Sequence, residues 1–334
     1  MEDYKILSVI CPIYNEERYI GQCIESILAQ DYPKDFLEVL FVDGMSNDNT
    51  REIIKEYSKK YSFIRLLDNP ERIVPYAMNR GILAAKGNII MRLDAHATYE
   101  KNYFSVLVNA LDLLKADNVG AVCHTDVLNK TSKTLAIREV LSNKFGVGNS
   151  VFRTGVDKIM RVDTVPFGCW RREVFNKYGL YDKRLVRNQD IELNKRILRG
   201  GGKIFIVPDT YCTYLARETF KGLFKNNYNN GKWNILTVFY TKQFDSLSIR
   251  HFIPLVFIVS LILPAILSIF YCPFILLSLI SLFLYLTVLS FICFRLSIMK
   301  QIRFFYLFIS FVTLHLSYGW GSLIGIIKLP FLKV

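Results

Sequence analysis

The last quarter of the chain lacks acidic residues: there is no aspartate or glutamate from Phe252 to Val334. Only five basic residues occur in the same region, and long uncharged stretches separate them. Helices built from such stretches have no polar face to turn toward water. Residues 1–251 are physically different, because they hold 37 basic and 29 acidic side chains. The sequence therefore predicts a charged N-terminal part followed by an apolar C-terminal part.

Three uncharged runs fill the apolar part, at residues 252–271, 274–294 and 304–327. Each has roughly the 20 residues that a helix needs to cross a hydrocarbon core of about 30 Å. The first two runs are joined by a turn at Cys272-Pro273, and Pro273 suits the first turn of the second helix, so these two helices should form a tight hairpin. We therefore expect residues 252–334 to form a bundle of three transmembrane helices.

The flanking basic residues predict the orientation of these spans, because such residues gather on the cytoplasmic side. Basic residues precede the first span and lie between the second and third, which places the Cys272 turn and the C-terminus outside. Two lysines near the C-terminus lie on the wrong side for this arrangement. The start of the chain has early acidic residues and only a short apolar run, unlike a signal peptide. We therefore expect a multi-pass protein of the inner (cytoplasmic) membrane with its N-terminal part in the cytoplasm. The basic residues that favour this orientation are Lys242, Arg250, Arg295, Lys300 and Arg303, and those that oppose it are Lys328 and Lys333.

Several familiar motifs are missing. No CxxC pair occurs, which favours reduced thiols over disulfides or zinc. Neither GxGxxG nor GxxxxGK[ST] occurs, so a bound nucleotide would be held by carboxylates, backbone groups and a metal ion. The net charge of +13 comes without a nucleic-acid-binding motif, and anionic lipid accounts for it more simply. We therefore expect membrane lipid, and no nucleic acid, as a partner.

In residues 1–214, short apolar runs alternate with amphipathic stretches four times. The pairs are "ILSVIC" with 18–29, "LEVLFV" with 49–60, "FIRLLD" with 74–85 and "NIIMRL" with 103–114. Strand followed by helix, repeated, predicts an α/β fold with a mainly parallel sheet. Ligands bind beyond the carboxyl ends of such strands. Polar clusters stand at three of these ends, "CPIYNEE", "DGMSNDNT" and "DAH".

Asp94 and His96 follow the fourth run, one residue apart. On an extended segment their side chains would point to the same side and face one ligand together. The alternative is that Asp94 caps the next helix while His96 is an ordinary surface residue.

With these motifs in order, residues 6–235 resemble the inverting family-2 glycosyltransferases of the GT-A fold. The stretches that carry the resemblance are "VICPIYNEERYIGQCIESILAQDYP", "VLFVDGMSNDNT" and "AMNRGILAAKGNIIMRLDAH". Gly44 and Met45 depart from the family pattern of two aspartates followed by Gly-Ser. The resemblance implies a nucleotide-sugar donor, with a UDP-sugar expected. It also implies that Asp43 bonds the base and that the other donor-binding residues are Pro12, Tyr14, Asn15, Glu16, Asn79 and Asp94.

The resemblance also implies a divalent cation, Mn²⁺ or Mg²⁺, because Asp94-Ala95-His96 stands in the position of the family's Asp-X-Asp motif. Asp94 offers a hard oxygen ligand. His96 replaces the usual second carboxylate, and imidazole suits Mn²⁺ better than Mg²⁺.

Residues 162–209 resemble the acceptor half of the family and contain the stretches "PFGCWRREVF" and "NQDIELNKRI". There Asp190 matches the catalytic base, Gln189 stands where glutamate is usual, and Gly168 lies in the acceptor segment. The alternative is that Asp190 is only the N-cap of the following helix.

Between residues 215 and 233, a basic stripe and an aromatic stripe repeat every four residues, as in helices at a membrane surface. The basic stripe is Arg217, Lys221 and Lys225, and the aromatic stripe is Phe220, Phe224 and Tyr228. The alternative is an ordinary solvated helix. "NNGKW" resembles a degraded Gln-x-x-Arg-Trp motif of processive synthases, with Lys232 and Trp233 as possible contacts to a pyrophosphate and a sugar. We therefore divide the chain into 1–214, an interfacial segment 215–251 and the membrane region 252–334.

Together these features look most like succinoglycan-type exopolysaccharide glucosyltransferases, which implies a polyprenyl-pyrophosphate-linked saccharide as acceptor. Two alternatives stay open at this point. One is a polyprenyl-phosphate sugar synthase, whose phosphate acceptor needs no general base. The other is a catalytically silent membrane scaffold.

Overall fold

A computed structural model describes residues 4–148, 150–244 and 251–332, and they form two compact units. The first unit comprises Met1–His124 and Val151–Leu215, and the second comprises Thr125–Ser150 and Ala216–Val334. The sequence prediction placed residues 125–150 in the first domain. The structure groups them with the C-terminal helices.

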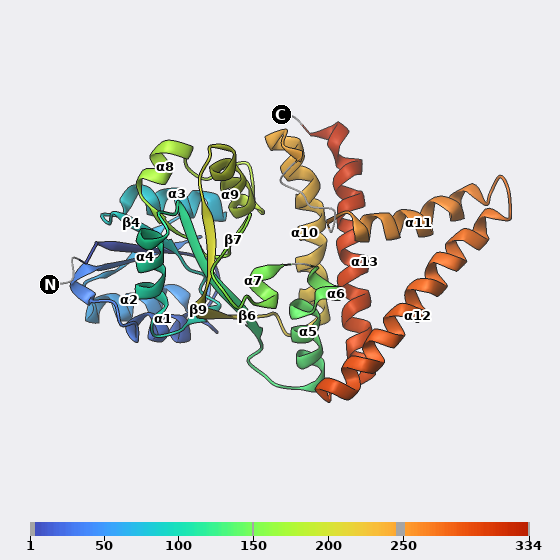
Figure 1. Cartoon of the computed structure of the whole chain (residues 1–334), viewed down its shortest axis with the longest axis horizontal. Coiled ribbons are helices and arrows are strands. Elements are labelled where there is room, and N and C mark those ends of the chain that lie inside the picture. Colours follow the sequence, from blue (N-terminus) through green and yellow to red (C-terminus); the bar gives the residue numbers. More distant parts are fainter. Residues whose placement is uncertain (1–3, 149, 245–250, 333–334) are drawn as a thin grey trace. The chain divides into compact units, whose positions relative to one another are not determined.

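The first unit begins with three strand–helix pairs, and in the fourth a short strand, β5 (Ala97–Tyr99), stands between β4 and α4; the alternation predicted from the sequence is thus confirmed apart from β5 (Figure 1). Strands β1, β2, β3 and β4 pair in parallel in the order β3-β2-β1-β4. Their bounds are Leu7–Ile13, Leu37–Asp43, Ile64–Asp68 and Ile89–Arg92. A short 3₁₀ helix, η1 (Lys34–Phe36), leads into β2. The helices are α1 (Ile20–Leu28), α2 (Thr50–Lys60), α3 (Val74–Ala84) and α4 (Tyr103–Leu113).

Antiparallel pairs occur in the other half of the sheet, between β4 and β8, β6 and β8, β5 and β9, and β7 and β9, so the sheet is mixed and the parallel pairing holds for β1 to β4. The sheet continues from β4 in the order β8-β6-β9-β5, and β7 also pairs with β9. These strands are β5 (Ala97–Tyr99), β6 (Asn118–Asp126), β7 (Met160–Arg161), β8 (Cys169–Arg171) and β9 (Ile204–Leu215). The connecting helices are α7 (Val151–Thr154), α8 (Glu173–Tyr178) and α9 (Gln189–Arg199).

Alternate residues of the parallel strands feed two hydrophobic cores, one on each face of the sheet. Leu7, Val9 and Cys11 of β1 pack with the buried residues of α1, α2 and α4. Ile10 of the same strand packs with α3, α8 and α9 on the opposite face. Helices on both faces leave the carboxyl ends of the strands as the edge that is open to a ligand.

The second unit is helical. Its helices are α5 (Ser132–Ser142), α6 (Lys144–Val147), α10 (Phe220–Thr241), α11 (Ile253–Leu267), α12 (Phe274–Lys300) and α13 (Phe304–Lys328), followed by the 3₁₀ helix η4 (Leu329–Phe331). Its core joins α5, α10, α12 and α13 through a cluster that includes Ile137, Leu223, Leu289 and Phe311. Figure 1 shows α10 and α13 side by side, with α11 and α12 forming a hairpin.

Two helices are long and apolar enough to cross a membrane, within the residues that the structure describes: Phe274–Lys300 and Phe304–Phe331. The first predicted span is shorter than expected, because α11 has only 15 helical residues and carries Pro264 inside it. At 1.5 Å per residue it is about 22 Å long, less than a hydrocarbon core of about 30 Å. Arg250 and Lys333, which entered the orientation argument, lie outside the described residues.

Candidate active site

The loops that follow β1 and β2 are bonded to one another. The backbone N–H of Asn15 donates to Ser46 Oγ at 2.8 Å, and the N–H of Asn47 donates to Asn15 Oδ1 at 3.0 Å. Asn15 has a φ of 55°, a conformation that asparagine tolerates better than most residues. The N–H of Glu16 donates to Thr50 Oγ1 at 2.8 Å. The predicted donor-binding loop is thus fixed to the second strand end, with the Tyr14 side chain 45% exposed beside Pro12.

Asp43 ends β2 and is fully buried. Its carboxylate accepts from the N–H of Ser46 at 3.0 Å, from Ser46 Oγ at 2.5 Å and from Arg51 Nη1 at 2.5 Å. Asp43 therefore organises the loop after β2, and its contact with a nucleotide base stays a prediction.

Arg92 is the last residue of β4, and its side chain is only 6% exposed. Its Nη2 donates to Asp94 Oδ1 at 3.0 Å, and its Nη1 forms an ion pair with Asp190 Oδ1. One buried guanidinium thus joins the residue predicted to bind the cation to the residue predicted to act as base. These two carboxylates come from positions 96 residues apart in the chain.

The backbone turns between Asp94 and His96, where extended chain was expected. β4 ends at Arg92, and β5 starts at Ala97 because it pairs antiparallel with β9. Tyr99 fixes the turn: the Asp94 N–H donates to Tyr99 Oη at 2.8 Å, and Tyr99 Oη donates to Asp94 O at 3.1 Å. His96 Nδ1 lies 3.2 Å from Glu16 Oε1, and its ring meets that of Tyr214 edge-on. The premise that Asp94 and His96 lie on one extended strand was wrong, and their joint contact with a cation stays a prediction.

Asp190 is the second residue of α9. The N-cap of this helix is Asn188, so the alternative that Asp190 is the N-cap is wrong. Its side chain is 30% exposed. Partial removal from water raises the pKa of Asp190, the positive charge of Arg92 opposes this rise, and the nearby Asp94 adds to it.

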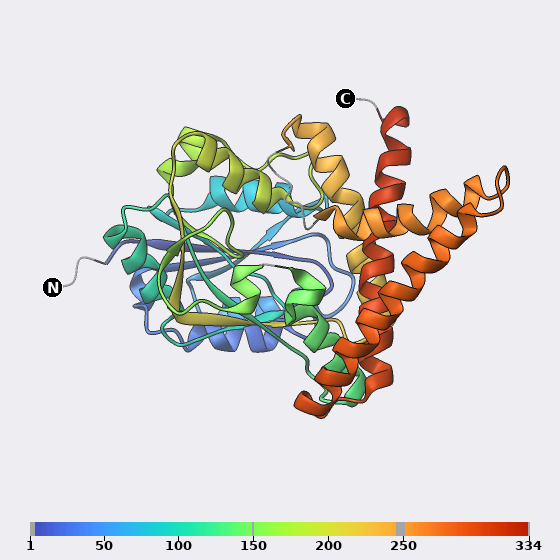
Figure 2. The ribbon, with the colours of Figure 1, turned by 45° about the vertical axis from the view of Figure 1, so that its right-hand side comes forward.

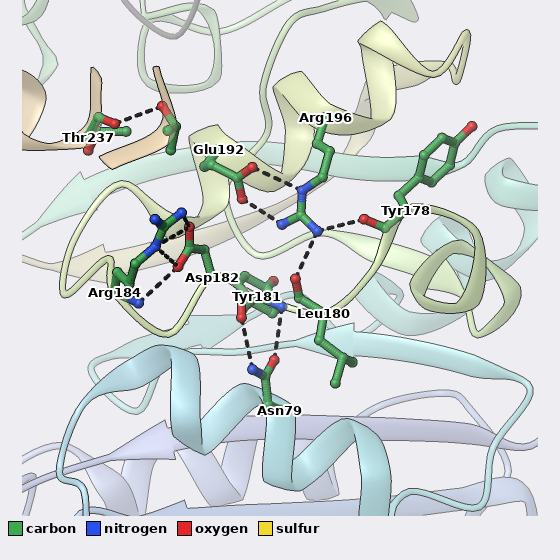
Figure 3. A network of polar contacts seen from close by, with 10 residues as sticks. Asn79, Tyr178, Leu180, Tyr181, Asp182, Arg184, Glu192, Arg196 and Thr237 are labelled. Carbon is green, nitrogen blue, oxygen red and sulfur yellow. Dashed lines mark hydrogen bonds and ion pairs between the residues drawn. The ribbon is translucent and has the colours of Figure 1, made fainter. Parts of the chain in front are cut away.

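A polar network holds α9 and the segment before it (Figure 3). Arg196 binds Glu192 through two contacts, and its Nη1 donates to the carbonyls of Tyr178 at 2.6 Å and Leu180 at 2.9 Å. The Asn79 side chain exchanges two 2.9 Å hydrogen bonds with the backbone of Tyr181. Asn79 thus connects α3 to the segment that leads into α9, and its predicted contact with the donor stays a prediction.

The predicted acceptor residues differ in their surroundings. Gly168 packs so closely that a Cβ there would lie 2.3 Å from Asn118 Oδ1, and its carbonyl accepts from the Arg92 N–H. Gln189 is 7% exposed, and its buried Oε1 has no hydrogen-bond partner among the residues that the structure describes. Lys232 and Trp233 belong to α10, in the second unit. Burial lowers the pKa of Lys232, and the neighbouring Lys328 lowers it further.

The donor atoms near Asp94 fit a cation that takes most of its ligands from elsewhere. No group of three His, Cys, Asp or Glu side chains suited to a metal ion occurs in residues 4–148, 150–244 and 251–332. Mg²⁺ and similar cations are often bound by one or two carboxylates together with substrate phosphates and water. Asp94 supplies such an oxygen, and an imidazole such as His96 is acceptable to Mn²⁺.

Comparison with known proteins decides the family. The sequence profile of glycosyl transferase family 2 matches residues 8–179, which is more than half of the chain. The chain belongs to glycosyltransferase family 2. The matched region contains Asp43, Arg92, Asp94 and His96 but ends before Asp190. The protein is therefore a glycosyltransferase, as the sequence predicted.

Two relatives of this family-2 glycosyltransferase are each 30% identical to it. One is the dolichyl N-acetyl-alpha-D-glucosaminyl phosphate 3-beta-D-2,3-diacetamido-2,3-dideoxy-beta-D-glucuronosyltransferase of Methanococcus voltae, over 67% of this chain and 71% of that protein. The other is the succinoglycan biosynthesis protein ExoA of Rhizobium meliloti, over 67% of each chain. The mannosyltransferase PcManGT of Pyrobaculum calidifontis, solved with GDP-Man and Mn²⁺, has a similar fold. It has a TM-score of 0.58 at 17% identity, over 96% of this chain and 89% of that one. The α/β domain is thus of the GT-A type.

Sequence reasoning missed Arg92, although a signal was present. Arginine is almost never fully buried unless it is paired. An arginine inside the apolar run "NIIMRL" therefore had to find an acidic partner. The partner on α9 is not evident from the sequence, because only the folded sheet brings β4 and α9 together.

Proposed function

We propose that this glycosyltransferase moves a sugar from a nucleotide-sugar, with UDP as the expected nucleotide, to a hydroxyl of a lipid-linked saccharide with inversion at the anomeric carbon. The acceptor hydroxyl attacks the anomeric carbon as the bond to the diphosphate breaks. Asp190 takes the hydroxyl proton, because a sugar hydroxyl is a poor nucleophile until its proton is removed. The nucleotide lies over the loops of Pro12–Glu16 and Asp43, and Gln189 and Gly168 lie on the acceptor side.

The observation that carries this proposal is the double contact of Arg92. Its guanidinium contacts Asp94 at 3.0 Å and is ion-paired with Asp190. The diphosphate must lie near the cation ligand, and the acceptor hydroxyl must lie near the base. An inverting displacement needs both groups within one substrate length of each other, and the Arg92 contacts support that spacing.

Asp94 and His96 would hold a divalent cation, Mn²⁺ or Mg²⁺. When bound, such a cation acts as a Lewis acid that neutralises charge on the leaving diphosphate. The protein supplies the rest: Tyr99 fixes the backbone of Asp94, and Glu16 fixes the ring orientation of His96 through Nδ1.

A lipid-linked acceptor is supported by the relatives and by the C-terminal helices. One relative is named for a dolichyl-linked N-acetyl-glucosaminyl phosphate and another for succinoglycan biosynthesis. The apolar helices of the second unit would hold the enzyme at the cytoplasmic face of the inner membrane, where such acceptors are embedded. Lys232 and Trp233 would contact the pyrophosphate and a sugar of the acceptor. Of the predicted three-span bundle, we retain α11 and α12 as the membrane anchor.

Asp190→Asn is the variant that tests this proposal. The purified full chain in detergent is given a panel of nucleotide-sugars, with a lipid-linked sugar or a lipid phosphate as acceptor. We expect transfer to the lipid-linked sugar to fall by about 10²-fold or more, the contribution of a positioned base, while donor affinity is unchanged. Excess EDTA should abolish transfer by the unaltered chain, and Mn²⁺ should restore it at least as well as Mg²⁺.

Asp163→Asn is the matched control. The Asp163 side chain is 53% exposed, and it pairs at 3.2 Å with Lys195 of α9, the helix that also carries Asp190. It should transfer sugar at the unaltered rate. If Asp190→Asn keeps a near-normal rate with a lipid phosphate as acceptor, the enzyme is a polyprenyl-phosphate sugar synthase. Full turnover in excess EDTA would remove the cation from the proposal.

A further inference from the structure

Helix α13 lies against α10 along most of its length (Figures 1 and 2). The rings of Phe220 and Tyr306 stack near the start of both helices. A Cβ on Gly231 would lie 2.0 Å from Tyr318 O, and one on Gly321 would lie 2.0 Å from Tyr228 O. Further along, Gly325 faces Lys232 and Ile235 of α10. Glycines at such contacts let two helix backbones touch, so the two helices form one fixed pair.

The partner helix α10 is too polar for hydrocarbon. Between Phe220 and Asn234 it contains three lysines and five asparagines. Charged side chains at the bilayer centre are costly and rare, and they occur where they pair with one another or line a cavity. A crossing by α13 would take α10 into the hydrocarbon with it.

Polar segments also touch α13 from a second side. The N–H of Arg303 donates to Ser132 Oγ at 3.1 Å, and His315 Nε2 lies 3.0 Å from the carbonyl of Phe145. Half of the most apolar window of α13 is buried inside the protein, against 11% for α12. The protein therefore covers a larger share of the apolar side chains of α13 than of those of α12.

The α11–α12 hairpin has the opposite character. No charged residue occurs from Phe252 to Phe294. The two helices are joined by a stack of Phe257 on Tyr285 at 4.3 Å and by a 2.7 Å hydrogen bond between the Ser260 and Ser281 hydroxyls. Figure 2 shows the hairpin extending away from α10 and α13. Its large exposed apolar side chains include Leu263, Ile266, Ile269, Phe270, Phe283 and Leu284.

Both ends of the hairpin are fixed to α13. A Cβ on Gly319 would lie 2.2 Å from the carbonyl of Pro254, at the start of α11. Leu289 and Cys293 of α12 belong to the same buried cluster as Phe311. Beyond these contacts, α11 continues over residues 255–267 and α12 over residues 274–288, which is about 20 Å and about 22 Å at 1.5 Å per residue. Both lengths are shorter than a hydrocarbon core of about 30 Å.

We propose that the α11–α12 hairpin is the membrane-binding surface, and that it enters an anionic phospholipid bilayer from one side and returns without crossing it. Helix α13 then lies along the headgroups beside α10, and the C-terminus stays on the same side as α10. Charge supports an anionic lipid as the partner, because the second unit holds 15 basic and four acidic residues, +11 of the total +13. This topology also removes the conflict of Lys328 with the orientation rule. It does not depend on the proposed sugar transfer.

Cysteine labelling tests the side on which the C-terminus lies. In a Cys272→Ser background, Phe331→Cys (82% exposed) reports on the end of α13, and Phe244→Cys (79% exposed) reports on the chain before α11. The six remaining cysteines are buried. A membrane-impermeant maleimide is applied to intact cells and, separately, to lysed cells. We expect both variants to be labelled under the same condition. Labelling of Phe331→Cys in intact cells, with Phe244→Cys labelled only after lysis, would show that α13 crosses and would overturn the proposal.

Tryptophan quenching tests the depth of α13 independently. Trp320 is 43% exposed on α13, and Trp170 is buried. A full-length Trp233→Phe chain is placed in vesicles of phosphatidylcholine and phosphatidylglycerol that carry nitroxides near the headgroup or deep in the acyl chains. We expect Trp320 to be quenched more by the shallow nitroxide. In the matched Phe283→Trp variant, the added signal should be quenched more by the deep one. Stronger deep quenching of Trp320 would contradict the proposal.

Discussion

Replacing Arg92 by glutamine should destabilise the first unit in a way that depends on the divalent cation. Arg92 is 6% exposed, and its guanidinium is the charge that faces both Asp94 and Asp190. Without it, two carboxylates lie close together with no compensating charge. Breaking a buried ion pair costs about 3–5 kcal/mol. The side chains of Asp94 and Asp190 are 18% and 30% exposed, so water screens part of the repulsion between them. We therefore expect the free energy of unfolding to fall by about 2–3 kcal/mol.

The assay is thermal unfolding of the purified chain in detergent, followed by circular dichroism with excess EDTA or with saturating Mn²⁺. For a domain of 150–250 residues, 1 kcal/mol corresponds to about 2–4 °C, so the midpoint should fall by about 4–12 °C in EDTA. With Mn²⁺ the loss should be smaller, because the bound cation replaces the missing guanidinium beside Asp94. The variant should also bind Mn²⁺ more tightly than the unaltered chain, because no guanidinium competes for Asp94.

Arg80→Gln provides the control. Arg80 pairs with Glu71 at 2.9 Å, and both side chains are more than a third exposed, at 44% and 36%. Exposed ion pairs contribute little to stability, so this variant should keep nearly the unaltered unfolding midpoint, both in EDTA and with Mn²⁺. If Arg92→Gln shows the same loss in EDTA and in Mn²⁺, Asp94 is not the residue shared between the guanidinium and the cation.

Two further variants probe the loop after β2 and the contact between α10 and α13. Asp43→Asn should lower the free energy of unfolding by about 1–3 kcal/mol in denaturant titrations, because the hydrogen bonds from Ser46 and Arg51 to a charged group are lost. The control is Asp68→Asn, at a side chain that is 58% exposed, and it should lower the free energy of unfolding by less than about 1 kcal/mol. Gly231→Ala should lower the free energy of unfolding of the second unit by about 1–3 kcal/mol and speed its proteolysis, because the new Cβ would meet the Tyr318 carbonyl. A Cβ at Gly21 would have nothing within 4 Å, so Gly21→Ala should instead stabilise α1 by up to about 1 kcal/mol.

The parallel half of the fold was predictable because its signals are local. Each of β1 to β3 is an apolar run followed directly by a helix, β4 is an apolar run followed by α4 after the short β5, and β2 is buried at all seven positions. Strands β5, β7 and β8 have only three, two and three residues, and they exist because β9, β4 and β6 offer partners. Such short strands carry no periodicity of their own, so the antiparallel half stayed unpredicted.

In the candidate site, too, the residues in local motifs were predictable and the contacts between distant segments were not. Asp94 and Asp190 were identifiable from local motifs that resemble the family pattern. The Arg92 bridge depends on contacts between β4 and α9, which no local pattern contains. The turn at Ala95–His96 was missed because its cause is the pairing of β5 with β9, more than 100 residues away in the chain.

The apolar C-terminal runs show what hydropathy alone leaves out when membrane spans are counted from a sequence. Composition reports how much apolar surface a helix has, but not which neighbour covers that surface. Both α12 and α13 are long and apolar enough to cross a membrane, yet 11% of the apolar window of α12 and 50% of that of α13 are buried in protein. The glycines at 231, 321 and 325 are what bring a polar helix against α13. A helix whose apolar face is already covered gains little by entering lipid, and its polar partner would lose water by following it. Within the residues that the structure describes, many large apolar side chains of the α11–α12 hairpin stay exposed, so the hairpin is the segment that we expect to gain by entering lipid.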